Sequence, residues 1–297
     1  MLERLLTEQP NPASEGIDAL SAEAILRIIN AEDRKVAEAV GLEIPRIAQA
    51  AEALAERLER GGRLFYIGAG SSGRLGVLDA AECPPTFNVP PELVQGLIAG
   101  GEAALARSTE ASEDDPGLGT RDLLDHGFAA SDALVGIAAS GRTPYVLGAV
   151  AKARELGALT IGISCTPGSE LSRAVHIPIE PLTGPEILTG STRMKAGTAT
   201  KLVLNMLSTA VMIRLGHVYG NLMVDVQPRN SKLLDRARRI VAEAAGVDEA
   251  CAAEYLEGSG GTVKVAILMA RLGIGRREAE TRLAAAGGRV CEALNNG

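Results

Sequence analysis

The sequence predicts an α/β protein, in which a mostly parallel sheet lies between two layers of helices, followed by a small helical domain. Short apolar strands alternate with amphipathic helices from about residue 45 to residue 180, the pattern of a parallel sheet covered on both faces. After about residue 229 the strand-like runs stop, and only helical segments separated by glycine follow. At roughly 150 residues per domain, the chain length of 297 residues also suits two domains.

The elements of the sheet follow one another regularly along the chain. Residues 45–60 carry apolar side chains at helical spacing, and Gly61 ends this helix. A strand over 63–67 then runs into the glycine-rich loop 68–73 and a helix that the proline pair at 84–85 is expected to end. Further strands are expected at 93–99, 133–139, 159–164 and 175–179, with helices at 102–111 and 143–157 and a long helix at about 195–215.

The pattern divides the chain into three parts. Residues 1–44 form an N-terminal arm and a helix, residues 45–236 the α/β domain, and residues 237–297 the small helical domain. In open parallel sheets, ligands bind in the loops beyond the carboxyl ends of the strands. We therefore look for the functional residues in those loops.

Composition excludes several classes of function. With Phe 3, Tyr 4 and Trp 0, the chain lacks the aromatic platform of a single-strand binder, and a net charge of −7 argues against nucleic acid as a partner. The N-terminus is not a signal peptide, and the longest apolar run, 202–216, contains Arg214, so we expect no membrane span and a cytoplasmic protein. The Cys and His residues stand too far apart to suggest a disulfide framework or a metal site.

Three loops at predicted strand ends combine glycine with Ser or Thr and with a basic side chain. They are residues 68–74, 139–145 and 183–201. Glycine lets the backbone approach a ligand, hydroxyls donate to oxyanions, and the following helix is expected to add free N–H groups and a partial positive charge. A single such loop is equally typical of an ordinary turn with a capping serine. Three in succession on one sheet favour a site that holds one phosphate from several sides.

The first loop also matches the dinucleotide fingerprint G-x-G-x-x-G between a strand and a helix. That fold expects an acidic residue about 20 residues further on, at the end of the next strand. Here the strand ends in Ala99 and two glycines, and Glu102 comes later. Ser71 and Ser72 moreover place hydroxyls at the tip of the loop, so we expect one phosphate and no dinucleotide cofactor.

Long ordered motifs carry a resemblance to a known family. The motifs are GAGSSGRLGVLDAAECPPTF, IAASGRTPYV, GPEILTGSTRMKAGTATK and GNLMVDVQPRNSKL, and the match begins at TEQPNP near the N-terminus. The chain resembles the N-acetylmuramic acid 6-phosphate etherases, a branch of the sugar isomerase (SIS) fold. The resemblance implies cleavage of N-acetylmuramic acid 6-phosphate to N-acetylglucosamine 6-phosphate and D-lactate, by a cytoplasmic homodimer that recycles cell-wall amino sugars without a metal or other cofactor.

The implied reaction suits two carboxyl groups. In the ring-opened sugar the C2 hydrogen is α to an aldehyde, so a base can remove it while an acid protonates the departing lactyl oxygen, and water then adds at C3. The family's pair falls on Glu82 and Glu113. Glu82 is expected at the carboxyl end of its helix, where the dipole and apolar neighbours favour the acid form. Glu113 is expected to take the C2 proton, although its acidic surroundings also suit a solvated surface, and Glu110 competes with it.

The resemblance and the loop pattern together indicate the substrate contacts. Lys201 and Asn205, on the next helix, are expected in packing or an interface, and some residues of the third loop are alternatively contacts to a second subunit. The helical tail resembles the family's three-helix domain, akin to ubiquitin-associated folds, which implies no ubiquitin binding. The expected ligands are Ser71, Ser72, Ser140, Arg142, Thr143, Ser191, Thr192, Arg193 and Lys195.

Two other functions share this fold. An aldose-ketose isomerase also moves a C2 proton with a carboxylate, and a non-catalytic sugar-phosphate sensor is the third possibility, because glucokinase regulatory protein has two similar domains. This chain has one such domain and no basic helix-turn-helix stretch, which counts against regulation. Release of D-lactate separates the etherase from both alternatives.

Overall fold

A computed structural model describes residues 6–107, 112–226 and 231–295 of the chain. The chain divides into two compact units, one of Met1–Ala81 with Pro91–Ser208 and one of Glu82–Pro90 with Thr209–Gly297. The first unit contains the parallel sheet, and the second contains most of the C-terminal helices. The sequence-based boundary at residue 236 stays a prediction.

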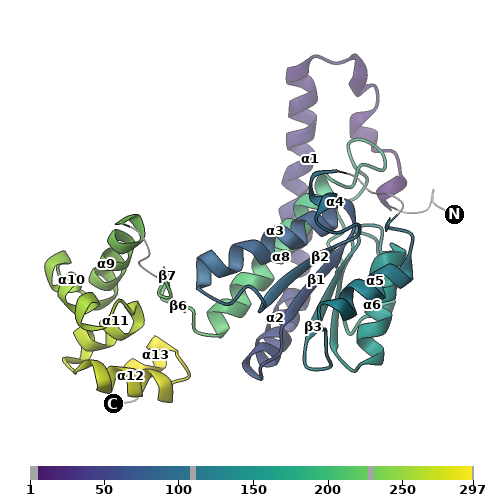
Figure 1. Ribbon diagram of the computed structural model, residues 1–297. Coiled ribbons are helices and arrows are strands. Elements are labelled where there is room, and N and C mark those ends of the chain that lie inside the picture. The colour runs from purple at the N-terminus through teal and green to yellow at the C-terminus, as the bar shows by residue number, and fades with distance from the viewer. Residues whose placement is uncertain (1–5, 108–111, 227–230, 296–297) are drawn as a thin grey trace. The chain divides into compact units, whose positions relative to one another are not determined.

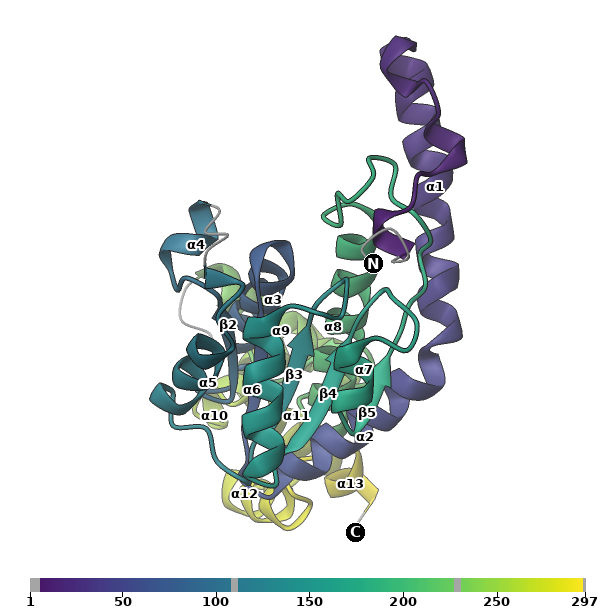
Figure 2. The same cartoon turned by 90° about the vertical axis from the view of Figure 1, so that its right-hand side faces the viewer.

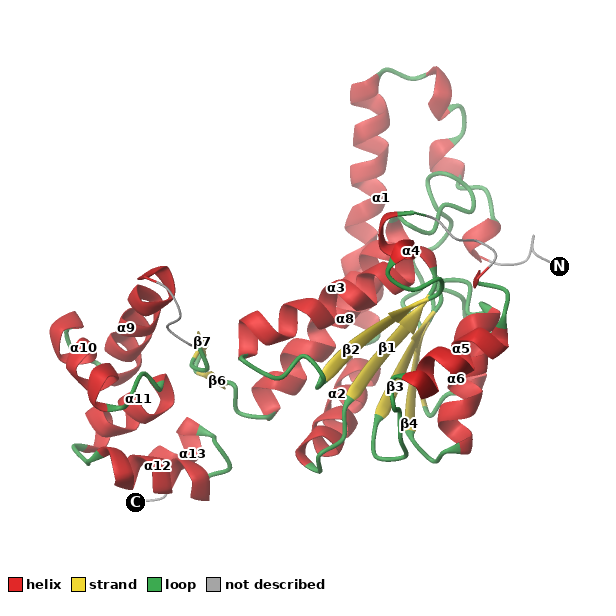
Figure 3. Ribbon diagram, viewed as in Figure 1, coloured by secondary structure: helices red, strands yellow, loops and turns green. Residues whose placement is uncertain are grey.

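The first unit is built on a five-stranded parallel sheet with the strand order β2-β1-β3-β4-β5 (Figure 3). The strand positions confirm the α/β prediction to within a few residues. β1 pairs with β2 on one side and with β3 on the other, so the order of connection reverses between β1 and β3. Ligands of such sheets bind in the crevice at this reversal. The strands are β1 (Leu64–Gly68), β2 (Val94–Ile98), β3 (Ala133–Ile137), β4 (Leu159–Ile163) and β5 (Ile177–Ile179).

Helices cover both faces of this sheet (Figures 1 and 2). α5 (Pro116–Asp125), α6 (Pro144–Glu155) and α7 (Glu170–Ala174) lie on one face. The opposite face carries α2, α3 and α8, and the long helix α1 extends beyond the sheet together with the short 3-10 turns of the N-terminal arm. The remaining bounds are α1 (Ala22–Leu42), α2 (Ile44–Glu59), α3 (Gly70–Phe87), α4 (Ala103–Ala106) and α8 (Lys195–Arg214).

Glycines allow α5 and α6 to pack backbone against backbone. A Cβ atom at Gly119 would lie 1.9 Å from the carbonyl oxygen of Tyr145, and one at Gly148 would lie 2.1 Å from that of Pro116. Tyr145 is fully buried beneath this contact, and its hydroxyl donates to Asp122 at 2.7 Å. This close packing fixes the position of the segment just before α5, and Glu113 belongs to that segment.

Two local predictions differ from the structure. α3 does not end at the proline pair but continues to Phe87. Pro84 and Pro85 have no N–H group, so the helix loses the two hydrogen bonds that these residues would donate. The last turn closes at Asn88, which has a φ of 54° and whose N–H donates to the Pro84 carbonyl. α5 was not predicted at all, although Asp115 caps it by accepting from Gly117 N–H at 2.8 Å. The helix expected after β2 is described only as α4, because part of it lies outside the described residues.

α8 meets the length and composition of a membrane-spanning helix, with half of that window buried in the fold. Within the first unit its inner side chains, such as Val203 and Leu207, are fully buried.

The second unit has its own apolar core beneath five helices in the part that is described. The short hairpin of β6 (Val218–Tyr219) and β7 (Leu222–Met223) leads into them, and Asp225 then accepts from His217 and Lys264, each at 2.7 Å. The ring of Phe87, from the end of α3, lies 6.4 Å from that of His217. The helices are α9 (Ser231–Ala245), α10 (Glu249–Gly258), α11 (Val263–Leu272), α12 (Arg276–Ala285) and α13 (Val290–Asn295).

Candidate active site

Two of the predicted loops meet at the reversal between β1 and β3. The first leads from β1 into α3, and Gly70 begins the helix at φ 52°. Close packing shapes this turn, since a Cβ at Gly73 would lie 2.6 Å from both the Gly68 carbonyl oxygen and the Ile98 side chain. Ser71 and Ser72 follow in the first turn of α3, half-buried and without a side-chain hydrogen bond to any residue in the described ranges. Their hydroxyls are therefore available to a ligand.

The second loop leads from β3 into α6. Gly141, at φ 67°, packs so closely on Ser169 that a Cβ would lie 2.2 Å from the serine hydroxyl. Thr143 precedes α6 as its N-cap but makes no capping bond through its side chain, and Arg142 is exposed and forms no ion pair with a described residue. This loop thus presents polar groups that the fold itself does not use.

Glu113 lies between these two loops. Its Oε1 atom is 3.3 Å from the position that a Cβ would occupy at Gly70, at the start of α3. Its carbonyl oxygen accepts from the Tyr145 N–H at 3.1 Å, in the first turn of α6. The Glu113 side chain is half-buried, whereas those of its acidic neighbours Asp114 and Asp115 are exposed. Its competitor Glu110 lies outside the described residues.

Glu82 occupies a different part of α3. Twelve residues separate it from Gly70 in one continuous helix, which at 1.5 Å per residue is about 18 Å along the axis. Its expected place at the last turn is wrong, because α3 continues to Phe87. The side chain is exposed and forms no hydrogen bond or ion pair within the described ranges. The start of α3, where the Glu113 carboxylate lies, is thus separated from Glu82 by more than three turns of helix.

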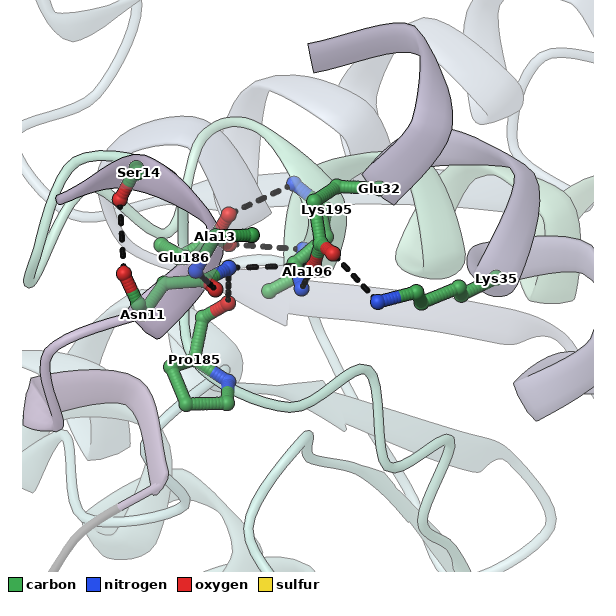
Figure 4. Close-up of polar contacts among 9 residues, drawn as sticks. All are labelled: Asn11, Ala13, Ser14, Glu32, Lys35, Pro185, Glu186, Lys195 and Ala196. Carbon is green, nitrogen blue, oxygen red and sulfur yellow. Dashed lines mark hydrogen bonds and ion pairs between the residues drawn. The ribbon is translucent and has the colours of Figure 1, made fainter. Parts of the chain in front are cut away.

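The third loop is held by buried charges (Figure 4). Glu186 accepts from the N–H groups of Lys195 and Ala196, both at 2.9 Å, so the expectation of free N–H groups at the start of α8 is wrong. Lys195 is 1% exposed, and its Nζ lies 2.7 Å from Glu32 Oε2 on α1. Burial alone raises the pKa of Glu32, but hydrogen bonds from Lys195, Lys35 and Asn11 lower it to about 2.

The N-terminal arm joins the same network. The Asn11 side chain donates to Glu32 at 3.1 Å and to the Pro185 carbonyl at 3.0 Å, so it connects the arm, α1 and the third loop. Lys195 thus lies in an internal ion pair, whereas Ser191 and Thr192 are half-buried and Arg193 is exposed in the turn before α8.

Two cavities adjoin these loops. One, of about 430 Å³, lies at the end of β3 and is lined by Ser140, Arg142 and Arg173 together with Gln9 of the arm. A second, of about 400 Å³, lies between α3 and α8, where Ser71, Arg193 and Lys201 line it. We name them the β3 cavity and the α3–α8 cavity. In the described ranges, no three His, Cys, Asp or Glu side chains are placed to hold a metal ion.

Sequence reasoning missed part of the β3 cavity. Ser164, Ser169 and Ser172 hydrogen-bond to one another at 2.8 to 3.2 Å beside it, and Arg173 lines it. The loop after β4 has the same mixture of glycine, serine and arginine as the three loops that were singled out. The same composition in residues 164–173 therefore indicates this loop as a further part of the site.

Comparison with known proteins places this arrangement in a family. Residues 46–154 match the model of the glucokinase regulatory protein N-terminal SIS domain. Over 279 residues the chain is 56% identical to the N-acetylmuramic acid 6-phosphate etherase of Yersinia pestis (strain Pestoides F), covering 94% of this chain and 95% of the relative. The chain belongs to the N-acetylmuramic acid 6-phosphate etherase family. The etherase of Yersinia pseudotuberculosis serotype O:1b (strain IP 31758) matches equally well.

A solved structure supports the SIS fold of this etherase family member. The phosphoheptose isomerase of Neisseria gonorrhoeae superposes with a TM-score of 0.50 at 20% identity, covering 64% of this chain and 98% of that one. The predicted fold class and the predicted family are thus confirmed. The individual site residues stay predictions.

Proposed function

We propose that the chain cleaves the D-lactyl ether of N-acetylmuramic acid 6-phosphate, eliminating D-lactate and then adding water to give N-acetylglucosamine 6-phosphate. The observation that carries this proposal is the position of Glu113 between two loops with unused hydroxyls, in a chain 56% identical to etherases over nearly its whole length. A carboxylate beside a phosphate site is what removal of a proton from a phosphosugar requires.

Glu113 acts as the base in this proposal. The C2 hydrogen becomes acidic when the ring opens, because the carbanion is delocalised into the C1 aldehyde. Glu113 takes this proton, and its carboxylate at Gly70 lies next to Ser71 and Ser72, whose hydroxyls hold the sugar. The hydrogen bond from the Tyr145 N–H to the main chain of Glu113 holds this residue beside the start of α6.

The β3 cavity holds the phosphate. Ser140 supplies a hydroxyl and Arg142 a guanidinium from the lining of this cavity, and Thr143 follows them in the same loop as a further proposed contact. None of the three side chains has a partner in the described part of the chain. Arginine matches the oxygens of a phosphate in geometry as well as in charge. Ser191 and Thr192 remain proposed contacts, whereas we assign Lys195 to holding the third loop through Glu32.

Glu82 acts as the acid that protonates the departing lactyl oxygen and then as the base that activates water. Because it lies about 18 Å along α3 from Gly70, a second copy of the chain must supply it. Ser71, Leu75, Leu78 and Glu82 share one face of α3, and Leu78 is 53% exposed. Along the helix, the point halfway between Leu75 and Leu78 is also the point halfway between Ser71 and Glu82. A two-fold axis there pairs Leu75 with Leu78 and brings each Glu82 to the partner's Ser71.

The remaining properties follow from this assignment. We propose a homodimer that works in the cytoplasm in the recycling of cell-wall amino sugars. Cys83, Cys165, Cys251 and Cys291 form no disulfide in the described part of the chain, which suits a reducing compartment.

The decisive experiment incubates the chain with N-acetylmuramic acid 6-phosphate in D₂O and measures D-lactate enzymatically. We expect D-lactate, and N-acetylglucosamine 6-phosphate that carries deuterium at C2. An isomerase or a sensor releases no D-lactate, so its absence refutes the proposal. Lactate without label at C2 contradicts the proton abstraction by Glu113.

A further inference from the structure

The α3–α8 cavity carries more positive charge than the fold neutralises. Arg193 and Lys201 project into it, and neither forms an ion pair or a hydrogen bond with a residue in the described ranges. Burial raises the pKa of the Asp79 carboxyl, and the positive charge of Lys201 acts in the opposite direction. The oxygens of that carboxylate already accept hydrogen bonds from Tyr66, Asn205 and Ser208. Two cationic side chains therefore line an open cavity, and no anionic side chain in the described ranges is paired with either of them.

A third cation in this cavity is fixed by the backbone. The Arg74 guanidinium donates to the carbonyl oxygens of Ala104 and Leu105, both at 3.1 Å, at the end of α4. This bonding accounts for Arg74 as a structural residue. Arg193 and Lys201 make no such bonds to the part of the chain that is described, and both are exposed.

The position of the cavity relative to Glu113 decides which anion it takes. The cavity begins at Ser71, the neighbour of Gly70, and the Glu113 carboxylate lies at Gly70. In the substrate, the carbon that loses its proton is adjacent to the carbon that carries the lactyl ether, whereas the phosphate is at the far end of the sugar. The lactyl group therefore lies beside Glu113, and its free carboxylate needs a cationic partner there.

We propose that Arg193 and Lys201 bind the D-lactyl carboxylate of the substrate in the α3–α8 cavity. This inference rests on the proposed function, since it assigns the second anion of the same substrate. It separates two anion sites: the β3 cavity with Arg142 for the phosphate and the α3–α8 cavity for the carboxylate. The sugar product lacks the carboxylate, so it loses this contact when lactate leaves.

The test measures binding rather than turnover. In a Glu113→Gln background, which blocks the reaction, calorimetry compares N-acetylmuramic acid 6-phosphate with N-acetylglucosamine 6-phosphate. Losing a charged hydrogen bond to a carboxylate weakens binding by about tenfold. We expect Arg193→Met and Lys201→Met to weaken binding of the lactyl substrate by this factor and to leave binding of the product unchanged.

Two further variants provide matched controls. Arg142→Met, in the β3 cavity, is expected to weaken binding of both ligands, because both carry the phosphate. Arg46→Met, exposed at the start of α2, removes the same charge and is expected to change neither. Circular dichroism melting confirms that every variant is folded.

The outcomes separate the two proposals. Equal weakening of both ligands by Arg193→Met and Lys201→Met assigns the phosphate to this cavity and overturns the inference, and so does the absence of any change. If wild type releases no D-lactate but the selective loss of binding persists, the etherase activity fails and the carboxylate site stands. If the chain binds neither ligand, both are overturned.

Discussion

The separation of the two catalytic glutamates along α3 leads to a complementation experiment. Glu82→Gln and Glu113→Gln are each expected to abolish D-lactate release as homodimers. The proposed two-fold pairing builds each site from Glu113 of one copy and Glu82 of the other, because about 18 Å of helix separates Glu82 from its own Gly70. A mixed dimer of the two variants therefore has one intact site and one that lacks both carboxyl groups.

The proposed pairing also predicts how much activity the mixed dimers recover. With equal amounts of the two variants and free exchange of subunits, about half of the dimers are mixed and each has one working site of two, so the activity returns to about a quarter of the wild-type rate. D-lactate is assayed before and after exchange, and native mass spectrometry measures the fraction of mixed dimers. If mixed dimers form but activity stays absent, the two glutamates act within one chain and the reasoning is refuted.

A variant of the exposed face controls for the contact itself. Leu78→Asp places two carboxylates close to the two-fold axis and is expected to give monomers by sedimentation, without activity. Leu124→Asp makes the same change at a leucine that is 42% exposed on α5, away from the proposed contact, and is expected to leave the dimer intact. If both variants sediment alike, the α3 face is not the interface.

The other predictions concern stability. Lys195→Met leaves Glu32 buried without its partner and is expected to lower the free energy of unfolding, measured with urea, by about 3–5 kcal/mol. The double variant with Glu32→Gln is expected to recover much of this loss. An unchanged urea midpoint in Lys195→Met contradicts the ion pair. The folded pKa of Glu32, about 2, lies below its ordinary value of 4.5, so its stabilisation is present above pH 4.5 and is lost as the pH falls towards 2. Acid titrations of wild type and Glu32→Gln are expected to converge in that range. Gly119→Ala forces a Cβ against the Tyr145 carbonyl and is expected to destabilise by about 1–3 kcal/mol. Gly41→Ala, in α1 with open space around it, is expected to stabilise by about 0.5–1 kcal/mol, and equal melting temperatures for these two variants contradict the packing.

The elements with strong local signals were predictable from the sequence. The strands are short apolar runs that end in glycine-rich loops, and parallel pairing brings those loops to one edge of the sheet. This is why Ser71, Ser140 and Thr143 could be predicted from the sequence as parts of one site. The place of Glu113 was not predictable from spacing, because it depends on the packing of α5 against α6 through Gly119. Only the family motif indicated it.

Other features depend on contacts between distant residues. In the sequence, Glu186 is one of several polar residues in a loop. In the fold it caps α8 by accepting from two N–H groups at the helix start, so these groups are not available to a phosphate. Lys195 looked like a ligand because it stands in a basic motif, but its partner Glu32 lies 163 residues earlier. The end of α3 was misplaced because a proline pair is a strong local signal for a break, yet the helix continues through it and closes at Asn88.

The hydrogen bond between Asn11 and Pro185 has a consequence for the synthesis of the protein. These residues are 174 positions apart, so this contact of the arm cannot form until most of the first unit has been made, whereas the bond from Asn11 to Glu32 needs only α1. Gln9 of the same arm lines the β3 cavity, and this wall of the proposed phosphate site forms only after the third loop emerges. A nascent chain can thus complete much of its sheet before this wall of the β3 cavity is in place.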